Sequence, residues 1–236
     1  MSESKQRVCL VYGSQFGNVQ RTVEEVLAKW QEKLKGKDAP FVLSEQALEG
    51  NDAGAALNAE SLAQDYDILV IFTSSYAKGD PPEGFGRLLW ELYQVRSTGN
   101  STRLAGMQHA LLGFGDKVYK STFQNNPRLT DKMMEENGSR RFHASNHEID
   151  ASSDNQEDLV NQWTDSVFEQ LMKTPKASDP PVPRVGEPLA DKEPAYSDEW
   201  DIKPAVSSGS NMLPFILLLL IVLLGLSAFF QKSGDL

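Results

Sequence analysis

The residues whose types and spacing favour ligand binding lie in three loops, each of which follows an apolar run. The first loop spans 13–19 and reads GSQFGNV. It offers a hydroxyl, a side-chain amide and successive backbone N–H groups at the start of a helical pattern. Because unpaired N–H groups and the helix dipole both favour an anion, this loop is suited to a phosphate. It matches neither the Walker motif nor G-x-G-x-x-G, and a plain helix start capped by Asn18 is the alternative.

The other two loops each place a tyrosine just after an apolar run. Loop 73–84 reads TSSYAKGDPPEG and sets Tyr76 among small residues, and loop 113–123 reads GFGDKVYKSTF and contains Tyr119. Two aromatic side chains can enclose a planar ring system, and stacking adds about 0.5–1.5 kcal/mol beyond the buried area. Either tyrosine alone is typical of a half-buried surface aromatic. A phosphate loop and two tyrosines at neighbouring strand ends would form a far more specific set.

Hydrophobic patterning predicts the elements that position these loops. Short apolar, β-branched runs predict strands over 7–12, 41–44, 67–73, 108–114 and 141–149. Apolar residues at helical spacing predict helices over 18–34, 84–95, 128–137 and 155–172. The alternation implies an α/β fold with a five-stranded parallel sheet, doubly wound by helices on both faces. In such sheets ligands bind at the carboxyl ends of the strands, near the point where the winding reverses, so we expect the three loops to meet.

The composition excludes several other classes of site. The chain has 236 residues, a formal net charge of -10 and a single cysteine, Cys9. One cysteine forms no intramolecular disulfide, and with three scattered histidines it builds no thiolate-rich metal site. Nucleic-acid binding needs a basic face, which the acidic charge argues against. We find no convincing catalytic triad and predict strand or surface positions for the histidines and an inert core position for Cys9.

The chain divides by composition into four segments. Segment 1–172 is the predicted globular domain, and its polar first residues argue against a cleaved secretory signal. Segment 173–211 holds seven of the twelve prolines and is predicted to be a disordered, Pro-rich linker that acts as a tether. Segment 212–230 contains 19 residues without a charge and as a helix would span about 28 Å, enough to cross a bilayer. Segment 231–236 is a short tail.

An apolar run in this position predicts a transmembrane tail anchor. Insertion after synthesis would leave a single-pass membrane protein with its N-terminal domain in the cytosol. A Leu-rich run with one cation in the tail, Lys232, favours the endoplasmic reticulum over the mitochondrial outer membrane, and a plastid envelope stays open. A buried core helix is the alternative, which the lack of a polar face argues against.

Taken in order, the three loops resemble the flavodoxin-like, FMN-binding domain of diflavin reductases such as cytochrome P450 reductase. YGSQFGN is similar to the family's YGSQTGT, SSYAKGDPPEGF to ATYGEGDPTDNA, and GFGDKVYKSTF to FGLGNKTYEHF. The step from Tyr119 to Phe123 is one residue longer, and this step and LAGMQHALLGFGDKVY are similar to the flavodoxin-like domain of the wybutosine-synthesising tRNA enzyme. The resemblance covers roughly residues 7–172 and includes neither FAD- and NADPH-binding modules nor an iron–sulfur radical domain.

The resemblance implies FMN as the cofactor and assigns its phosphate to the first loop. The phosphate would be held largely by backbone N–H groups of a loop made of Ser14, Gln15, Phe16, Gly17, Asn18 and Val19. Phe16 and Asn18 stand where the family has threonines. Two hydroxyl contacts, each worth about 1 kcal/mol, are therefore expected to be lost unless they are replaced.

The resemblance also places the flavin ring between the two tyrosine loops. Tyr76 would cover one face of the isoalloxazine and Tyr119 the other. Asp116 and Phe123 match positions that line the ring and its ribityl side. The remaining expected contacts are Ser74, Ser75, Ala77, Phe114 and Gly115, with Asp150 on the last loop or, as the alternative there, Asp154.

Ala77 departs from the family, which usually has glycine after this tyrosine. The family's peptide is expected to turn its carbonyl toward N5 of the reduced flavin. A positive φ is easy for glycine and costs alanine on the order of 1 kcal/mol. The resemblance therefore predicts a smaller population of one-electron-reduced flavin than in a glycine-containing relative.

The implied function is a membrane-tethered electron carrier that passes electrons from a separate reductase to a separate acceptor protein. The acidic surface would suit basic partners. One alternative is a quinone reductase of flavodoxin-like fold that uses NAD(P)H directly. The other is a degenerate domain that has lost FMN and serves as a membrane scaffold, for which Phe16, Asn18 and Ala77 argue.

Overall fold

The computed structural model describes residues 4–99, 102–144, 148–184, 186–189 and 191–201. By its internal contacts the chain forms two compact units, Met1–Ser197 and Asp198–Leu236. The described part of the second unit is one short 3₁₀ helix, η3 (Asp198–Asp201). The candidate site lies wholly in the first unit.

The first unit is built on a parallel sheet with the strand order β2-β1-β4-β5-β6. Two further short strands extend its edges, because β3 also pairs with β1 and β7 also pairs with β5. The sheet therefore has five positions, and the predicted five-stranded parallel α/β sheet is confirmed. The strands are β1 (Gln6–Gly13), β2 (Phe41–Leu43), β3 (Leu48–Glu49), β4 (Ile68–Ser74), β5 (Gln108–Gly115), β6 (Arg140–Arg141) and β7 (Glu148–Asp150).

The edge strand expected over 141–149 is divided into β6 and β7. Arg140 pairs with Gln108, and Glu148 pairs with Gly113. Eight steps of the edge chain thus run beside five steps of β5, so the edge chain cannot stay paired along its whole length. Hydrophobicity alone carries no signal for such a change of register.

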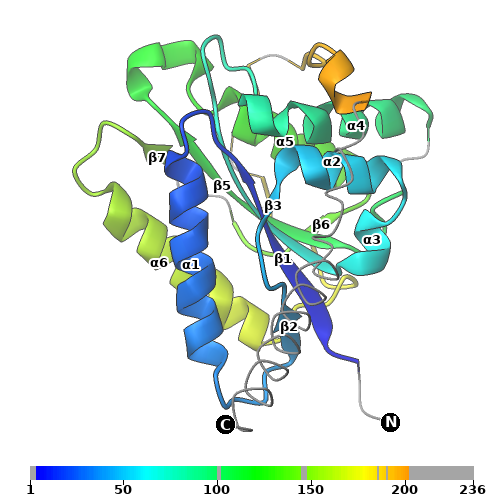
Figure 1. Ribbon diagram of the computed structural model, residues 1–236, viewed down its shortest axis with the longest axis vertical. Coiled ribbons are helices and arrows are strands. Elements are labelled where there is room, and N and C mark those ends of the chain that lie inside the picture. The colour runs from blue at the N-terminus through cyan, green and yellow to red at the C-terminus, as the bar shows by residue number, and fades with distance from the viewer. Residues whose placement is uncertain (1–3, 100–101, 145–147, 185, 190, 202–236) are drawn as a thin grey trace, which may run out of the picture. The chain divides into compact units, whose positions relative to one another are not determined.

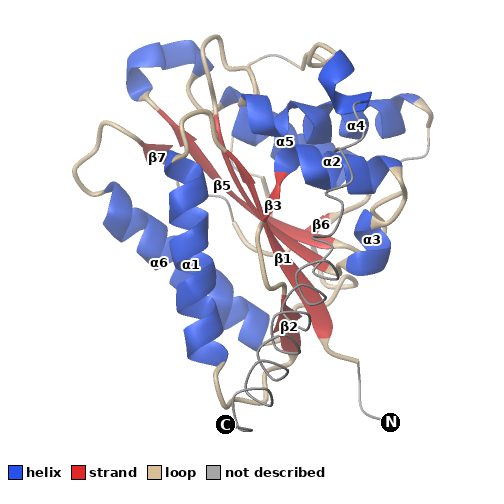
Figure 2. Cartoon of the chain, viewed as in Figure 1, coloured by secondary structure: helices blue, strands red, loops and turns tan. Residues whose placement is uncertain are grey.

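The helices lie on both faces of the sheet. The helical elements are α1 (Asn18–Leu34), α2 (Gly50–Asn58), α3 (Leu62–Asp65), η1 (Glu83–Phe85), α4 (Gly86–Ser97), η2 (Lys117–Thr122), α5 (Asn125–Glu136) and α6 (Gln156–Met172). Helices α1 and α6 cover one face, and α2 to α5 cover the other (Figures 1 and 2). Alternate residues of β1 feed the two layers, Val8 and Leu10 toward α1 and α6, Cys9 and Val11 toward the opposite layer.

Helix α2 was not predicted, because its buried face consists largely of small residues. Gly50, Ala53 and Gly54 are buried there together with Leu57. A Cβ atom built on Gly54 would lie 2.7 Å from the backbone N of Leu88, so α2 and α4 approach more closely than side chains would allow. A pattern of large apolar residues, on which helix prediction relies, is absent from this interface.

A network of buried polar side chains lies at the start of β5. His109, Asp131, Ser139 and Arg141 are each at most 3% exposed. His109 Nδ1 lies 2.9 Å from Ser139 Oγ, and its Nε2 lies 3.1 Å from Asp131 Oδ1. Arg141 Nε donates to both carboxylate oxygens of Asp131 at 2.8 and 3.0 Å. This confirms a strand position for His109, although its side chain is fully buried and takes part in a charged network.

The first part of the predicted linker packs along the domain. The described residues between 175 and 196, here called the strap, run from the start of β5 across α5 to α4. Pro175 O accepts hydrogen bonds from the side chains of Gln6 and Gln108, each at 2.9 Å. Val182 exchanges two hydrogen bonds with Arg141, from Val182 N to Arg141 O and from Arg141 Nη1 to Val182 O.

This packing differs from the expectation of a disordered linker that begins at 173. Backbone carbonyls and carboxylates of the strap accept hydrogen bonds from the domain. The proline content, on which the expectation of disorder relied, gives no information about such contacts. The predicted membrane span 212–230 and tail 231–236 lie outside the described residues. Within the described part of the chain, no helix is both long enough and apolar enough to cross a membrane.

The buried network makes the fold sensitive to the charge of Asp131. Replacing Asp131 by Asn removes the buried carboxylate from the fully buried Arg141 guanidinium, which then keeps only the partly exposed Glu135 as an acidic partner. We expect Asp131→Asn to lower the free energy of unfolding at pH 7 by about 3–5 kcal/mol, measured by urea denaturation. The matched control is Asp165→Asn, whose carboxylate is 44% exposed beside Lys29 and Lys33 and is expected to cost at most about 1 kcal/mol. Equal losses in the two variants would contradict the role given to burial.

The same carboxylate predicts a pH dependence of stability. Burial raises the pKa of Asp131. The hydrogen bond from His109 and the charge of Arg141 lower this pKa by more than burial raises it, so the folded pKa is below the ordinary value. A depressed folded pKa stabilises the fold above the unfolded value of about 4, and this contribution is lost as the pH falls through the folded pKa. Unfolding of the wild type should therefore become easier below about pH 4 more steeply than unfolding of Asp131→Asn.

Candidate functional site

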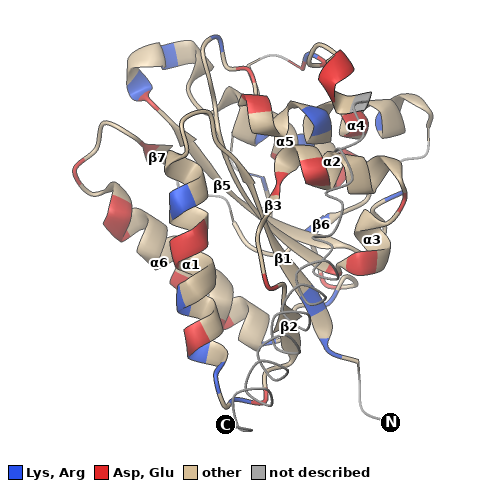
Figure 3. Cartoon of the chain, viewed as in Figure 1, with Lys and Arg blue, Asp and Glu red and all other residues tan. Residues whose placement is uncertain are grey.

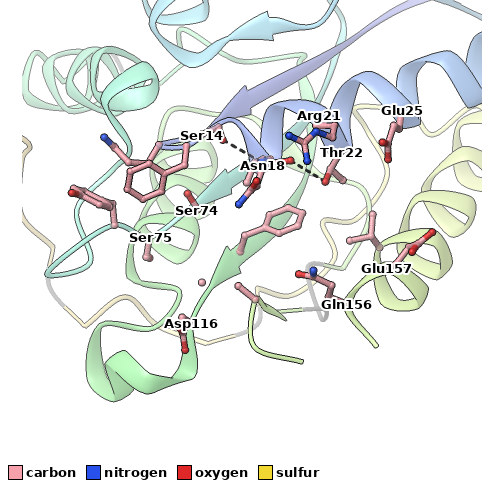
Figure 4. Close-up of a pocket in the computed structure, with 18 of the residues that line it drawn as sticks. Ser14, Asn18, Arg21, Thr22, Glu25, Ser74, Ser75, Asp116, Gln156 and Glu157 are labelled. Carbon is pink, nitrogen blue, oxygen red and sulfur yellow. Dashed lines mark hydrogen bonds between the residues drawn. The ribbon is translucent and has the colours of Figure 1, made fainter. Parts of the chain in front are cut away.

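The three predicted loops surround one cleft of about 670 Å³ at the carboxyl ends of β1, β4 and β5 (Figure 4). The structure therefore brings together most of the predicted site. The predicted residues that line the cleft are Ser14, Gln15, Phe16, Asn18, Val19, Ser74, Ser75, Tyr76, Ala77, Phe114, Gly115, Asp116 and Tyr119. Both tyrosines face this cleft, and they are partly exposed, Tyr76 by 42% and Tyr119 by 57%.

The first loop presents free backbone donors to the cleft. Helix α1 begins at Asn18, and the residue before it, Gly17, has the left-handed φ of 81°. Ser14 Oγ accepts a hydrogen bond from Val19 N at 3.2 Å, so a side chain caps the helix from within the loop (Figure 4). Within the described residues, the N–H groups of 15–18 have no acceptor in the protein. The alternative of a helix start capped by Asn18 is wrong, since Asn18 is the first helical residue.

Phe16 contacts the second loop through its aromatic ring. Its side chain is 77% exposed, and its ring meets the Tyr76 ring edge to face at 5.9 Å between centroids. Gln15 joins the same two loops, because its Oε1 accepts a hydrogen bond from Glu83 N at 3.0 Å. The residue that replaces a threonine of the resembling family thus makes an aromatic contact instead of a hydroxyl contact.

The second loop forms a tight turn from Tyr76 to Asp80. Tyr76 N donates to Asp80 O, and both Gly79 N and Asp80 N donate to Tyr76 O, each at 2.9 Å. Ala77 has a φ of 46° and Gly79 a φ of 88°. The left-handed conformation that was expected to be costly for alanine is therefore present in this turn, where neighbouring hydrogen bonds hold it.

The third loop is the 3₁₀ segment η2, which follows β5. Asp116 Oδ1 accepts a hydrogen bond from Val118 N at 2.8 Å and caps this segment. Lys120 interrupts it with a φ of 47°. The kink lies between Tyr119, which lines the cleft, and Phe123, which does not.

Three predicted site residues do not line the cleft. Gly17 supplies backbone conformation only, and the space where its Cβ would be is open. Phe123 lies behind the strand end, where a Cβ on Gly115 would come within 3.1 Å of its ring. Asp150 is turned to the loops: it accepts hydrogen bonds from Lys117 N at 3.3 Å and from Ser152 N and Oγ at 3.1 and 2.8 Å.

The loop contacts of Asp150 stabilise the ionised form of its carboxyl outside the cleft. Burial raises the pKa of this carboxyl. The hydrogen bonds from Ser152 and from the Lys117 backbone lower the pKa by more than burial raises it, so the net shift is downward. The alternative residue, Asp154, is likewise absent from the cleft lining. The last loop contributes Ala151 instead.

The cleft continues into a groove between α1 and α6 that sequence reasoning missed. Figure 4 shows Arg21, Thr22 and Glu25 on one wall, and Gln156 and Glu157 on the other. The remaining groove residues are Val26, Lys29, Val160 and Asn161. These residues recur at steps of three and four on each helix, which is the signal that could have found them.

The sheet order and the cleft at its carboxyl edge define a flavodoxin-like α/β domain. The chain belongs to the flavodoxin family of electron-transfer flavoproteins, because residues 10–163 match the family model described as Flavodoxin. A bifunctional cytochrome P450/NADPH–P450 reductase of Bacillus cereus is 35% identical over 113 residues, which cover 48% of this chain and 10% of that protein. Methionine synthase reductase of Mus musculus is 28% identical over 173 residues, 71% of this chain and 22% of that protein. The chain thus spans less than a quarter of the length of these relatives.

Solved structures agree with the fold. A cysteine-to-alanine mutant of flavodoxin from Pseudomonas aeruginosa is 18% identical, with a TM-score of 0.53 over 70% of this chain and 98% of that one. A mutant of Fusobacterium nucleatum flavodoxin bound to flavin mononucleotide is 12% identical, with a TM-score of 0.50 over 72% and 96% of the two chains. At these identities the likeness shows the fold alone.

The strained turn leads to a prediction about Ala77. An alanine with a positive φ costs about 1–2 kcal/mol of stability, and a glycine does not bear this cost. A glycine also increases the conformational entropy of the unfolded chain, which lowers the stability of the fold by about 0.4–1 kcal/mol. Ala77→Gly should therefore leave the free energy of unfolding unchanged or raise it by up to about 1.5 kcal/mol. Lys78→Gly in the same turn is the control, because Lys78 has no positive φ and should lose about 0.4–1 kcal/mol. Chemical denaturation of both variants without added cofactor measures these changes. If Ala77→Gly were less stable than Lys78→Gly, Ala77 would not be strained in the wild type.

Proposed function

We propose that this chain is a membrane-tethered FMN electron carrier that receives electrons from a separate reductase and passes them to a separate acceptor protein. Membership of the flavodoxin family indicates FMN as the cofactor. The observation that carries the proposal is the single cleft in which a loop of unpaired N–H groups and two tyrosines from neighbouring loops meet. When bound, FMN supplies the redox chemistry, and the protein supplies binding and orientation.

The geometry fits the two ends of FMN. The free N–H groups of 15–18 stand at the start of α1, where the helix dipole also favours the phosphate. Tyr76 and Tyr119 line the same cleft, and aromatic side chains of this kind stack on planar rings. Arg21 in the groove lies one turn beyond the phosphate loop and adds a cation on that side (Figure 4).

The cleft does not favour the scaffold alternative. Two partly exposed tyrosines and N–H groups without a protein acceptor all border one cleft of about 670 Å³, which is an arrangement suited to a ligand. Phe16, which argued for loss, packs on Tyr76 and supports the ring that would stack. The quinone reductase alternative needs direct reduction by NAD(P)H and is separated by experiment.

The loops that border the ring site carry balanced charge. Figure 3 shows basic and acidic residues interspersed over α1. The second and third loops hold Lys78, Lys117 and Lys120 against Asp80, Glu83 and Asp116. The net charge of -10 therefore lies elsewhere, and we infer that apolar contact with Tyr119 and its exposed neighbour Val118 contributes to docking of redox partners.

The carrier proposal is tested with the full chain in detergent. We expect nearly one FMN per chain after reconstitution, no reduction of a quinone with NADPH alone, and reduction of cytochrome c once a flavoprotein reductase is added. Tyr119→Ala should weaken FMN binding about tenfold through lost stacking and burial, whereas Val118→Ala, beside it and outside the cleft lining, should not. A colourless protein that cannot be reconstituted would exclude the carrier, and NADPH-dependent quinone turnover by the chain alone would favour the reductase.

The tether is the second part of the proposal and rests on the sequence. The charge-free run 212–230 is long enough to span a bilayer, and the domain before it would face the cytosol, with the endoplasmic reticulum as the proposed membrane. In cells, the full chain should remain in the membrane pellet after extraction at alkaline pH, and a chain ending at 211 should be released. Release of the full chain under these conditions would exclude a membrane span and leave the cofactor assignment untouched.

A further inference from the structure

We propose that the strap is a positioning element for the turn that carries Tyr76, and that Asn125 transmits its effect. This inference rests on the proposed function, because Tyr76 and Ala77 of the turn line the proposed FMN cleft. No described residue of the strap lines the cleft, so the effect is indirect and passes through a chain of contacts from the strap to the turn.

Asp191 fixes the strap on the face formed by α4 and α5. Its carboxylate accepts hydrogen bonds from Arg96 Nη1 at 3.1 Å and from Lys132 Nζ at 2.7 Å, and a further one from the Tyr93 hydroxyl. Partial burial raises the pKa of Asp191, but the hydrogen bonds from Lys132, Tyr93 and Arg96 lower it to about 2. The side chain is thus ionised and held by two helices at neutral pH.

Two residues before Asp191, the strap reaches the first turn of α5. Leu189 N donates to Oδ1 of Asn125 at 2.7 Å. Nδ2 of the same amide donates to Gly79 O at 3.1 Å. The strap donor therefore favours the orientation in which the NH₂ end of the Asn125 amide faces the turn, because only that end can donate to a carbonyl.

The contact between Asn125 and the turn leaves little free space. A Cβ built on Gly79 would lie 2.8 Å from the Asn125 Cβ, so the two backbones pack as closely as glycine allows. The next residue, Asn126, holds the preceding part of the same loop: its N donates to Ser75 Oγ at 3.0 Å and its Nδ2 to Ser74 O at 2.9 Å. The first turn of α5 thus supports the loop from Ser74 to Gly79.

Rotation of the Asn125 amide would turn an acceptor toward the Gly79 carbonyl and remove the hydrogen bond that holds it. The turn from Tyr76 to Asp80 would then keep only the backbone hydrogen bonds within itself, with Ala77 still in a left-handed conformation. Release of the strap should therefore loosen the turn and reduce the pre-organisation of the Tyr76 ring. One amide side chain thus connects a segment outside the cleft to the wall that would cover the cofactor.

The experiment compares three variants of the full chain in detergent, first without cofactor. Leu189→Pro removes the donor to Asn125, and Asp191→Asn removes the charge that fixes the strap. Asp179→Asn is the matched control, because that strap carboxylate accepts from Lys176 N within the strap itself. Amide hydrogen exchange at Gly79 and Asp80 should become about fivefold faster in the first two variants, the effect of losing one net hydrogen bond, and should not change in the control.

FMN titration of the same proteins gives the second readout, and the dissociation constant should rise by a similar factor in the first two variants. Exchange at Gly79 and Asp80 that stays at the wild-type rate while strap amides exchange faster would overturn the inference. The inference would also be overturned if the strap amides exchanged at the wild-type rate in both variants, because the contacts of Leu189 and Asp191 would then not hold the strap in place. If the wild type fails to bind FMN, the proposed function falls, and the exchange data still decide whether strap and turn are coupled.

Discussion

The cleft depends on the close approach of helices to the sheet at the row where the strands end. Gly13 pairs with Thr73, and Thr73 pairs with Gly113, so these three residues form one row across β1, β4 and β5. A Cβ on Gly13 would lie 2.5 Å from the Phe85 ring, and one on Gly113 would lie 2.0 Å from Gln124 Oε1. Any side chain at either position would push η1 or the start of α5 outward. The loops can converge because this row is kept free of side chains on both flanks.

Hydrogen bonds between loops then give the cleft a defined shape before any ligand binds. Gln15 joins the first loop to the second, and Ser75 joins the second to the end of β5 through a bond from its N to Phe114 O at 3.0 Å. Asp150 joins the last loop to the third. Such cross-links reduce the conformational entropy that a ligand would otherwise have to remove on binding. Asp150 does not line the cleft because its carboxylate forms one of these hydrogen bonds between loops.

The sequence predicted the parts of the molecule that depend on local pattern. The buried strands, α1 and α6 follow from period and composition, and the three cleft loops follow from strand ends in a parallel sheet. The failures are non-local. Helix α2 is held by glycine contacts with α4, the split of β6 from β7 is a matter of register, and the strap is held by single polar partners such as Asp191. Phe123 was misplaced because Lys120 reverses the chain with a positive φ, which no residue type in KVYKSTF announces.

Ser139, His109 and Asp131 are hydrogen-bonded in the order found in serine hydrolases, yet all three lie in the interior. Arg141 occupies the outer side of Asp131 and is itself covered by Val182. Ser139 is buried and does not line the cleft, so a substrate carbonyl has no path to its hydroxyl. The two ring nitrogens are also exchanged relative to a catalytic triad, because Nδ1 of His109 faces the serine and Nε2 faces the carboxylate. These buried hydrogen bonds instead hold β5, α5 and β6 together. Solvent accessibility therefore distinguishes a structural Ser–His–Asp network from a catalytic one.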